Sequence, residues 1–212
     1  PQHVNANLQR ARIALQRRDG QRALEFLARI PEETPPLQLI RAEALEYAGQ
    51  HDQAVSLLEG LTREASDPRV LFAVGLTAGR IGAFEIAESA FNRVLATQPN
   101  NYDVLFNLGR AAARAKHYDR AQRALEVAAK LKPADPDTLL ELGLAYAASQ
   151  ESSRAFYVLA QARQHAPKRP DILLALARAA EDAGFYGDAV VAFDEYLTLR
   201  PADDTARRDR AR

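Results

Sequence analysis

The chain has 212 residues and a balanced charge, with 28 Lys and Arg residues against 28 Asp and Glu residues. Its 42 Ala and 27 Leu residues favour helices and argue against a large sheet. The absence of Cys excludes disulfides, thiolate nucleophiles and cysteine zinc sites, and the neutral balance argues against nucleic acid as a partner.

Two divergent helix–turn–helix units are predicted at the start of the chain, over residues 4–34 and 35–67. Apolar residues recur in steps of three and four, which is typical of amphipathic helices. The spacing from Ala23 to Ala54 is shorter than the spacing from Ala54 to Ala87, and both are shorter than in the units that follow. We therefore expect the first unit to be shortened.

Four regular units follow, and we predict them over residues 68–101, 102–135, 136–169 and 170–203. Each unit has a closing proline at the same position, namely Pro99, Pro133, Pro167 and Pro201. A small residue recurs at the same spacing, as Ala87, Ala121, Ala155 and Ala189. A third set is Val74-Gly75, Leu108-Gly109, Leu142-Gly143 and Leu176-Ala177. Three independent sets with one common period of about 34 residues indicate a structural repeat.

Each unit is expected to hold two helices of roughly 14 residues joined by a tight turn. Gly82 and Gly184 stand where the periodicity breaks, and glycine suits the left-handed turn that ends a helix. Pro133 and its equivalents end the second helix, because proline cannot continue one. None of the eleven prolines falls inside a proposed helix.

The last segment, residues 204–212, is predicted to start a capping or further helix, since Asp203 and Asp204 favour a helix N-terminus. The chain starts at Pro1 and contains no Met, so we expect a piece of a longer protein. No apolar stretch approaches the ~18–20 residues that a membrane-spanning helix needs. We expect a soluble chain without direct membrane insertion, in the cytoplasm or the periplasm.

The repeats resemble the tetratricopeptide repeat family, and the unit from Pro136 carries the resemblance well. Its matching positions are Leu139, Leu142-Gly143, Tyr146, Ala155, Leu159 and Pro167, with Leu in place of the family's Trp. The resemblance implies an all-α fold of the bacterial type, a right-handed α-solenoid of stacked antiparallel helix hairpins. About six units and a C-terminal partial helix would form one superhelical domain over residues 1–212.

The resemblance also implies a protein–protein interaction scaffold that binds a partner segment in its concave groove. The first helix of each unit lines that groove in this family. The peptide-binding residues it implies are Phe72, Arg80, Phe106, Arg110, Arg114, Leu140, Leu144, Leu174 and Arg178. Arginines there would pair with carboxylates of a protein or peptide ligand. The alternative is that the apolar residues pack between units and the arginines are ordinary solvated side chains.

Enzyme chemistry is not indicated. The four histidines are His3, His51, His117 and His165, and none stands four residues from another. No phosphate-binding loop, dinucleotide-binding or nucleophile-elbow motif occurs. We expect no catalytic residue, no metal and no cofactor.

Two other interpretations remain open. The chain could be the non-catalytic arm or self-assembly module of a larger enzyme or of a secretion or envelope protein. Self-assembly would give a homodimer through an open solenoid end, formed by Phe185, Val190, Phe193 and Leu197.

Overall fold

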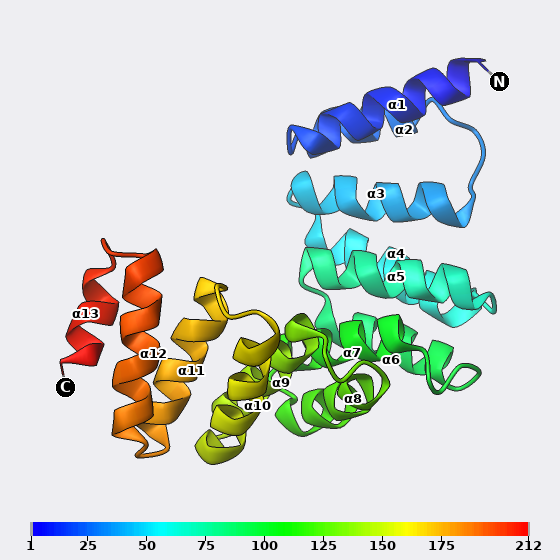
Figure 1. Ribbon diagram of the computed structural model, residues 1–212. Coiled ribbons are helices and arrows are strands. Elements are labelled where there is room, and N and C mark those ends of the chain that lie inside the picture. The colour runs from blue at the N-terminus through cyan, green and yellow to red at the C-terminus, as the bar shows by residue number, and fades with distance from the viewer. Residues whose placement is uncertain (1, 212) are drawn as a thin grey trace. The chain divides into compact units, whose positions relative to one another are not determined.

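The computed structural model describes residues 2–211, and its elements within that range are helices (Figure 1). They are α1 (Gln2–Gln16), α2 (Gly20–Leu27), α3 (Pro35–Tyr47), α4 (His51–Glu64), α5 (Pro68–Ile81), α6 (Phe84–Leu95), α7 (Tyr102–Arg114), α8 (Tyr118–Leu131), α9 (Pro136–Ala148), α10 (Ser152–His165), α11 (Pro170–Asp182), α12 (Tyr186–Leu199) and α13 (Asp204–Arg210). Consecutive helices pack as antiparallel pairs. The predicted all-α fold of stacked helix hairpins is confirmed.

Contacts divide the chain into two compact units, an N-terminal unit of residues 1–99 and a C-terminal unit of residues 100–212. The N-terminal unit holds α1 to α6, and the C-terminal unit holds α7 to α13. The prediction of one domain stays a prediction, as does the right-handedness of the solenoid. The end residues of the predicted domain, Pro1 and Arg212, lie outside the described range. Within residues 2–211, no helix combines the length and apolar character that crossing a membrane demands.

Local sequence explains where the helices begin. Proline occupies the first turn of α3, α5, α9 and α11, where its missing N–H costs no hydrogen bond. Asn101 accepts a hydrogen bond from the backbone N–H of Val104, and Asp135 accepts one from that of Thr138. These side-chain caps satisfy N–H groups that have no partner inside the helix.

The turn inside each hairpin requires one residue with positive φ. Gly82 and Gly184 supply it with φ of 84° and 78°, as the sequence predicts. At the equivalent position of two other repeats, Lys116 and Gln150 take φ of 63° and 65°. A non-glycine residue in this conformation costs on the order of 1 kcal/mol or more. The turn geometry is therefore imposed by the packing of the two helices and not only by glycine.

The small residues of the first helices allow the two helices of a hairpin to touch. A Cβ atom added to Gly109 would lie 2.4 Å from Cγ of Leu125, and one added to Gly143 would lie 2.5 Å from Cγ of Leu159. The residue in contact with each glycine is the large one four positions after a regularly spaced alanine, such as Ala121, which is itself fully buried.

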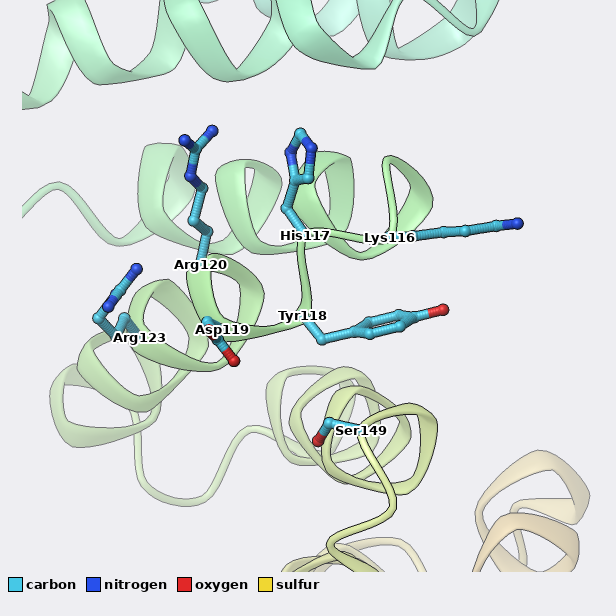
Figure 2. A pocket seen from close by; sticks show the side chains of 7 residues that line it. All are labelled: Lys116, His117, Tyr118, Asp119, Arg120, Arg123 and Ser149. Atoms are coloured by element: carbon cyan, nitrogen blue, oxygen red, sulfur yellow. The ribbon is translucent and has the colours of Figure 1, made fainter.

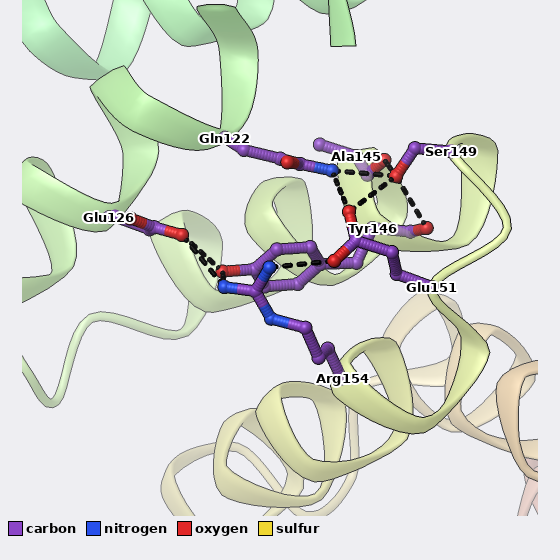
Figure 3. Close-up of polar contacts among 7 residues, drawn as sticks. All are labelled: Gln122, Glu126, Ala145, Tyr146, Ser149, Glu151 and Arg154. Atoms are coloured by element: carbon purple, nitrogen blue, oxygen red, sulfur yellow. Dashed lines mark hydrogen bonds and ion pairs between the residues drawn. The ribbon is translucent and has the colours of Figure 1, made fainter. Parts of the chain in front are cut away.

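Polar side chains connect neighbouring repeats of the C-terminal unit (Figure 3). Tyr146 on α9 donates a 2.6 Å hydrogen bond to Glu126 on α8, and Arg154 on α10 contacts both. Arg154 also pairs with Glu151 at 2.6 Å. Gln122 on α8 donates to Glu151 at 2.8 Å. This network fixes the register between α8 and the hairpin that follows it.

The C-terminal end of the chain is partly covered. Helix α13 packs on α12 and buries Ala206 completely. Tyr196 donates a 2.7 Å hydrogen bond to Asp203, which caps α13. Phe193 is only 1% exposed, so its predicted place on an open apolar end is wrong. Val190 does stay 40% exposed.

Candidate peptide-binding surface

In the C-terminal unit, the first helices of successive repeats approach one another more closely than the second helices do. Helix α7 contacts α9, and α9 contacts α11. The second helices α8, α10 and α12, all within the described part of the chain, make no comparable contacts among themselves. Because the first helices pack closer together, this unit curves toward them. Helices α7, α9 and α11 therefore line its inner side.

Apolar side chains predicted for the groove lie on these first helices. Leu144 on α9 is 44% exposed, whereas its neighbour Ala145 is buried. Phe106, Leu140 and Leu174 are half-buried and pack against the core of the unit. The inner surface thus offers one protruding leucine and three partly accessible apolar side chains.

The ring of Phe106 is held in place by two neighbours. It stacks on Tyr102 with centroids 6.1 Å apart, and the guanidinium of Arg110 lies 5.6 Å from its centroid. The Tyr102 hydroxyl in turn donates a 2.9 Å hydrogen bond to Asp135. Such fixation reduces the entropy that Phe106 would lose when a ligand packs against it.

Two predicted arginines of the C-terminal unit have internal partners. Nε of Arg110 lies 3.1 Å from Oε1 of Glu141 on the adjacent first helix. Arg178 lies 3.8 Å from Asp209 on α13. Both guanidinium groups stay about half exposed, so each remains able to exchange its partner for a ligand carboxylate.

Arg114 differs from the other two. It ends α7, is exposed, and forms no ion pair with any residue in the range 2–211. Its position in the last turn of the helix favours a cation through the helix dipole. Of the predicted arginines in this unit, it is the one whose charge has no protein partner within the described range.

Two predicted residues belong to the N-terminal unit. Phe72 on α5 is half-buried and packs against Phe91 with ring centroids 5.8 Å apart. Arg80, at the end of α5, pairs with Glu43 on α3. Phe72 thus packs within its own hairpin, and Arg80 stays more than half exposed.

The sequence pointed to the cations of the inner surface but missed their acidic partners. Glu43, Glu141 and Asp209 each approach an arginine from a neighbouring helix. In the sequence, only the charge of these acidic residues pointed to ion pairing, because the two members of each pair are separated by roughly one repeat. Which acid reaches which arginine depends on side-chain direction in the folded stack.

No arrangement suited to metal binding is found among residues 2–211, where no three His, Asp or Glu side chains are grouped as ligands. His51 lies 2.6 Å from Glu46 in an exposed position at the start of α4. This pair lies in the N-terminal unit, outside the inner surface of α7, α9 and α11. The inner surface can bind a segment by apolar contact and ion pairing.

Residues 82–140 match the family model of the tetratricopeptide repeat. This segment carries tetratricopeptide repeats. For residues 82–140, the match confirms the family that the repeat period and the Leu-Gly and Ala positions indicated.

Solved structures of bacterial tetratricopeptide proteins share the fold. MamA from Desulfovibrio magneticus RS-1 has a TM-score of 0.65 and 22% identity, covering 82% of this chain and 98% of MamA. MamA AMB-1 has a TM-score of 0.63 and 24% identity over 80% of this chain and 93% of its own. A thermophilic tetratricopeptide protein in Thermus thermophilus has a TM-score of 0.54 and 23% identity, covering 84% and 97%. No curated protein matches the sequence.

These likenesses establish the fold as a tetratricopeptide-type stack of helix hairpins. Tetratricopeptide repeats generally serve protein–protein interaction, and scaffolds of this fold are typically non-catalytic. The similarity does not by itself assign a partner.

Proposed function

We propose that the chain is a protein-interaction scaffold that binds a segment of a partner protein along the inner surface of its C-terminal unit. The observation that carries the proposal is the 44% exposure of Leu144 among otherwise buried neighbours on α9. An apolar side chain that the fold leaves accessible on a surface lined with arginines is suited to anchor a ligand.

The charges of the inner surface suggest what the segment contains. Arg114 has no ion-pair partner within residues 2–211, and Arg110 and Arg178 hold weak, half-exposed ion pairs. A ligand carboxylate would gain a charge-assisted hydrogen bond at Arg114 without first breaking one. We therefore expect a segment with an apolar residue close to an Asp or Glu, in extended or helical form.

The test is capture of partners by the immobilised chain from a lysate of the organism that encodes it, read by mass spectrometry. A groove variant combines Phe106→Ala, Arg110→Glu and Arg114→Glu. A matched control combines Leu131→Ala, Lys130→Glu and Lys168→Glu, which are exposed residues away from the first helices. The control carries the same change of charge and also removes one apolar side chain.

A protein retained by the native chain and the control but lost by the groove variant supports the proposal. Its binding segment, made as a peptide, should then bind the purified chain in a calorimetric titration. If the groove variant retains the same protein as the native chain, binding lies on another surface and the proposal is wrong. Circular dichroism must show equal helicity of all three forms.

A further inference from the structure

The turns that join the helices of each hairpin all lie at one edge of the C-terminal unit. We call the segments 114–123, 148–157 and 182–191 the turn edge, and they occupy equivalent positions in three successive repeats. Because successive hairpins stack in chain order, the middle segment lies between the other two. The three segments differ sharply in charge.

The first segment of the turn edge is basic. Lys116 and Arg123 are exposed and form no ion pair with any residue between positions 2 and 211. They line a hollow of about 340 Å³ (Figure 2). The complete lining consists of Lys116, His117, Tyr118, Asp119, Arg120, Arg123 and Ser149. Lys116, Arg120 and Arg123 are basic side chains of this lining, and Asp119 is its one acidic side chain.

The third segment is acidic and aromatic. Asp182 and Asp188 are exposed and have no ion-pair partner within the described range. Between them Tyr186 is 69% exposed. Residues 179–199 contain five acidic residues and no Lys, Arg or His. This end of the turn edge thus presents a protruding ring flanked by carboxylates.

The middle segment carries no uncompensated charge. Gln150 and Ser153 are exposed, and the charge of Arg154 is neutralised by Glu151 and by Glu126. Tyr157, at the position equivalent to Arg123, is 61% exposed. It is supported by Phe156, whose ring centroid lies 5.3 Å from that of Tyr157.

We propose that the turn edge is a homodimer interface, in which a second copy of the chain binds in the opposite direction across a two-fold axis near Tyr157. A two-fold rotation at the middle repeat places the basic segment of each copy opposite the acidic segment of the other. A two-fold interface uses the same surface on both copies, so that surface must complement itself. The order of positive, neutral and negative along the turn edge meets this condition.

The hollow adds shape to the charge pattern. It is large enough to admit an aromatic ring, and Tyr186 of the second copy would arrive at it with Asp182 and Asp188 on either side. Lys116 and Arg123 would then meet both a ring face and two carboxylates, which are the partners that exposed cations prefer. Tyr157 of each copy would pack at the axis, covering apolar area that a single copy leaves in water.

The pattern favours a second copy over an unrelated partner. A basic ligand would explain the acidic segment, and an acidic ligand the basic one, but neither would explain both on either side of an uncharged centre. The turn edge meets the inner surface at Arg114, but Leu144 and Arg110 are not part of the turn edge, and Lys116 and Arg123 are not part of the inner surface. The dimer variants leave Arg114 unchanged, so failure of one proposal leaves the other standing.

Sedimentation velocity on the purified chain tests the proposal through charge reversal. An acidified variant carries Lys116→Glu and Arg123→Glu, and a basified variant carries Asp182→Lys and Asp188→Lys. We expect the native chain to dimerise, and each variant alone to have a dissociation constant at least about tenfold higher, since each contact occurs twice by symmetry. A 1:1 mixture of the two variants should recover a dimer, and so should a chain that carries all four changes.

Three controls keep the result clear. Lys130→Glu with Lys168→Glu reverses two exposed cations away from the turn edge and should leave the dimer unchanged. Tyr186→Ser keeps every charge but should weaken the dimer at least about tenfold, because the ring no longer fills the hollow. Raising the salt concentration should weaken the native dimer, because exposed charges are screened.

A native chain that stays monomeric at every concentration tested overturns the proposal. So does a dimer that survives in both variants, because the interface then lies elsewhere. Lack of recovery in the mixture, with each variant shown to be folded by circular dichroism, would also contradict the antiparallel arrangement.

Discussion

The hydroxyl of Tyr146 donates a 2.6 Å hydrogen bond to Oε1 of Glu126, which lies on the second helix of the preceding repeat. Arg154 reaches the same carboxylate at 3.0 Å and lies over the Tyr146 ring, 4.0 Å from its centroid. One tyrosine at the repeat's core position thus ties three helices together. It also couples the stability of the stack to pH.

Replacement of Tyr146 by Phe should lower the free energy of unfolding by about 1 kcal/mol at neutral pH, the usual net value of one hydrogen bond. Chemical denaturation followed by circular dichroism measures this. Tyr47→Phe is the control, because Tyr47 is exposed and its hydroxyl forms no hydrogen bond with residues 2–211. Equal losses for the two variants would show that the Glu126 contact contributes nothing.

Burial, and next the hydrogen bond to Glu126, raise the pKa of Tyr146 well above its ordinary value. A raised pKa favours the protonated form in the folded state. The stability it provides is complete below the unfolded pKa of about 10 and is lost as the pH rises toward the folded pKa. Denaturation curves should therefore show a steeper loss of stability above pH ~10 in the native chain than in Tyr146→Phe.

For Asp135 we expect the opposite pH dependence, with stability lost at low pH. Burial acts to raise the pKa of its carboxyl, but hydrogen bonds from Thr138 and Tyr102 outweigh it and leave the pKa below its ordinary value. The contribution of the lowered Asp135 pKa to stability is complete above the unfolded pKa of about 3.9 and is lost as the pH falls through the folded pKa. Asp135→Asn should cost about 1 kcal/mol at neutral pH, because the charge-assisted hydrogen bonds from Thr138 and Tyr102 become neutral ones.

The difference between native and Asp135→Asn chains should shrink below pH ~4, which acid titrations of denaturant midpoints can follow. Glu64→Gln serves as a control, since this exposed residue at the end of α4 caps no helix. A gap between native and Asp135→Asn that persists unchanged at the lowest pH would contradict the assignment.

Two glycine substitutions should have opposite effects. Gly109→Ala places a Cβ atom 2.4 Å from Leu125, so the two helices must move apart at a cost of about 1–3 kcal/mol. Gly79→Ala, inside α5, meets no atom within 4 Å and should stabilise by roughly 0.5–1 kcal/mol. Thermal unfolding of both variants checks the pair. A Gly109→Ala chain as stable as the native one would show that the contact can relax freely.

Substitutions at Leu144 and Leu159 should distinguish a loss of binding from a loss of stability. Leu144 is 44% exposed, so Leu144→Ala should change the free energy of unfolding by no more than about 0.5 kcal/mol while weakening binding of the partner segment. Leu159 is fully buried against Gly143, and Leu159→Ala should cost about 2–5 kcal/mol. Denaturation and calorimetric titration of the partner peptide distinguish the two. Undiminished binding by Leu144→Ala would remove Leu144 from the site.

Much of the fold could be predicted because the repeat is local. The periods of three and four, the prolines between hairpins and the glycines of the turns act within one or two turns of chain, and each is visible in the order of residues. The positive φ at Lys116 and Gln150 could not be predicted with the same ease, since nothing in either side chain favours it. There the packing of the hairpin overrides residue preference.

The sequence by itself determined the repeat period, the helix hairpins and the resemblance to the tetratricopeptide repeat. It also indicated which first-helix residues are candidates for binding. Only the tertiary structure decided that Arg110 faces Glu141, that Phe193 is buried near the chain's end, and that the charges of the turn edge lie in the order positive, neutral, negative. The reason is physical: hydrophobic periodicity and turn chemistry act between near neighbours, whereas ion pairing and burial depend on side chains that approach from separate helices.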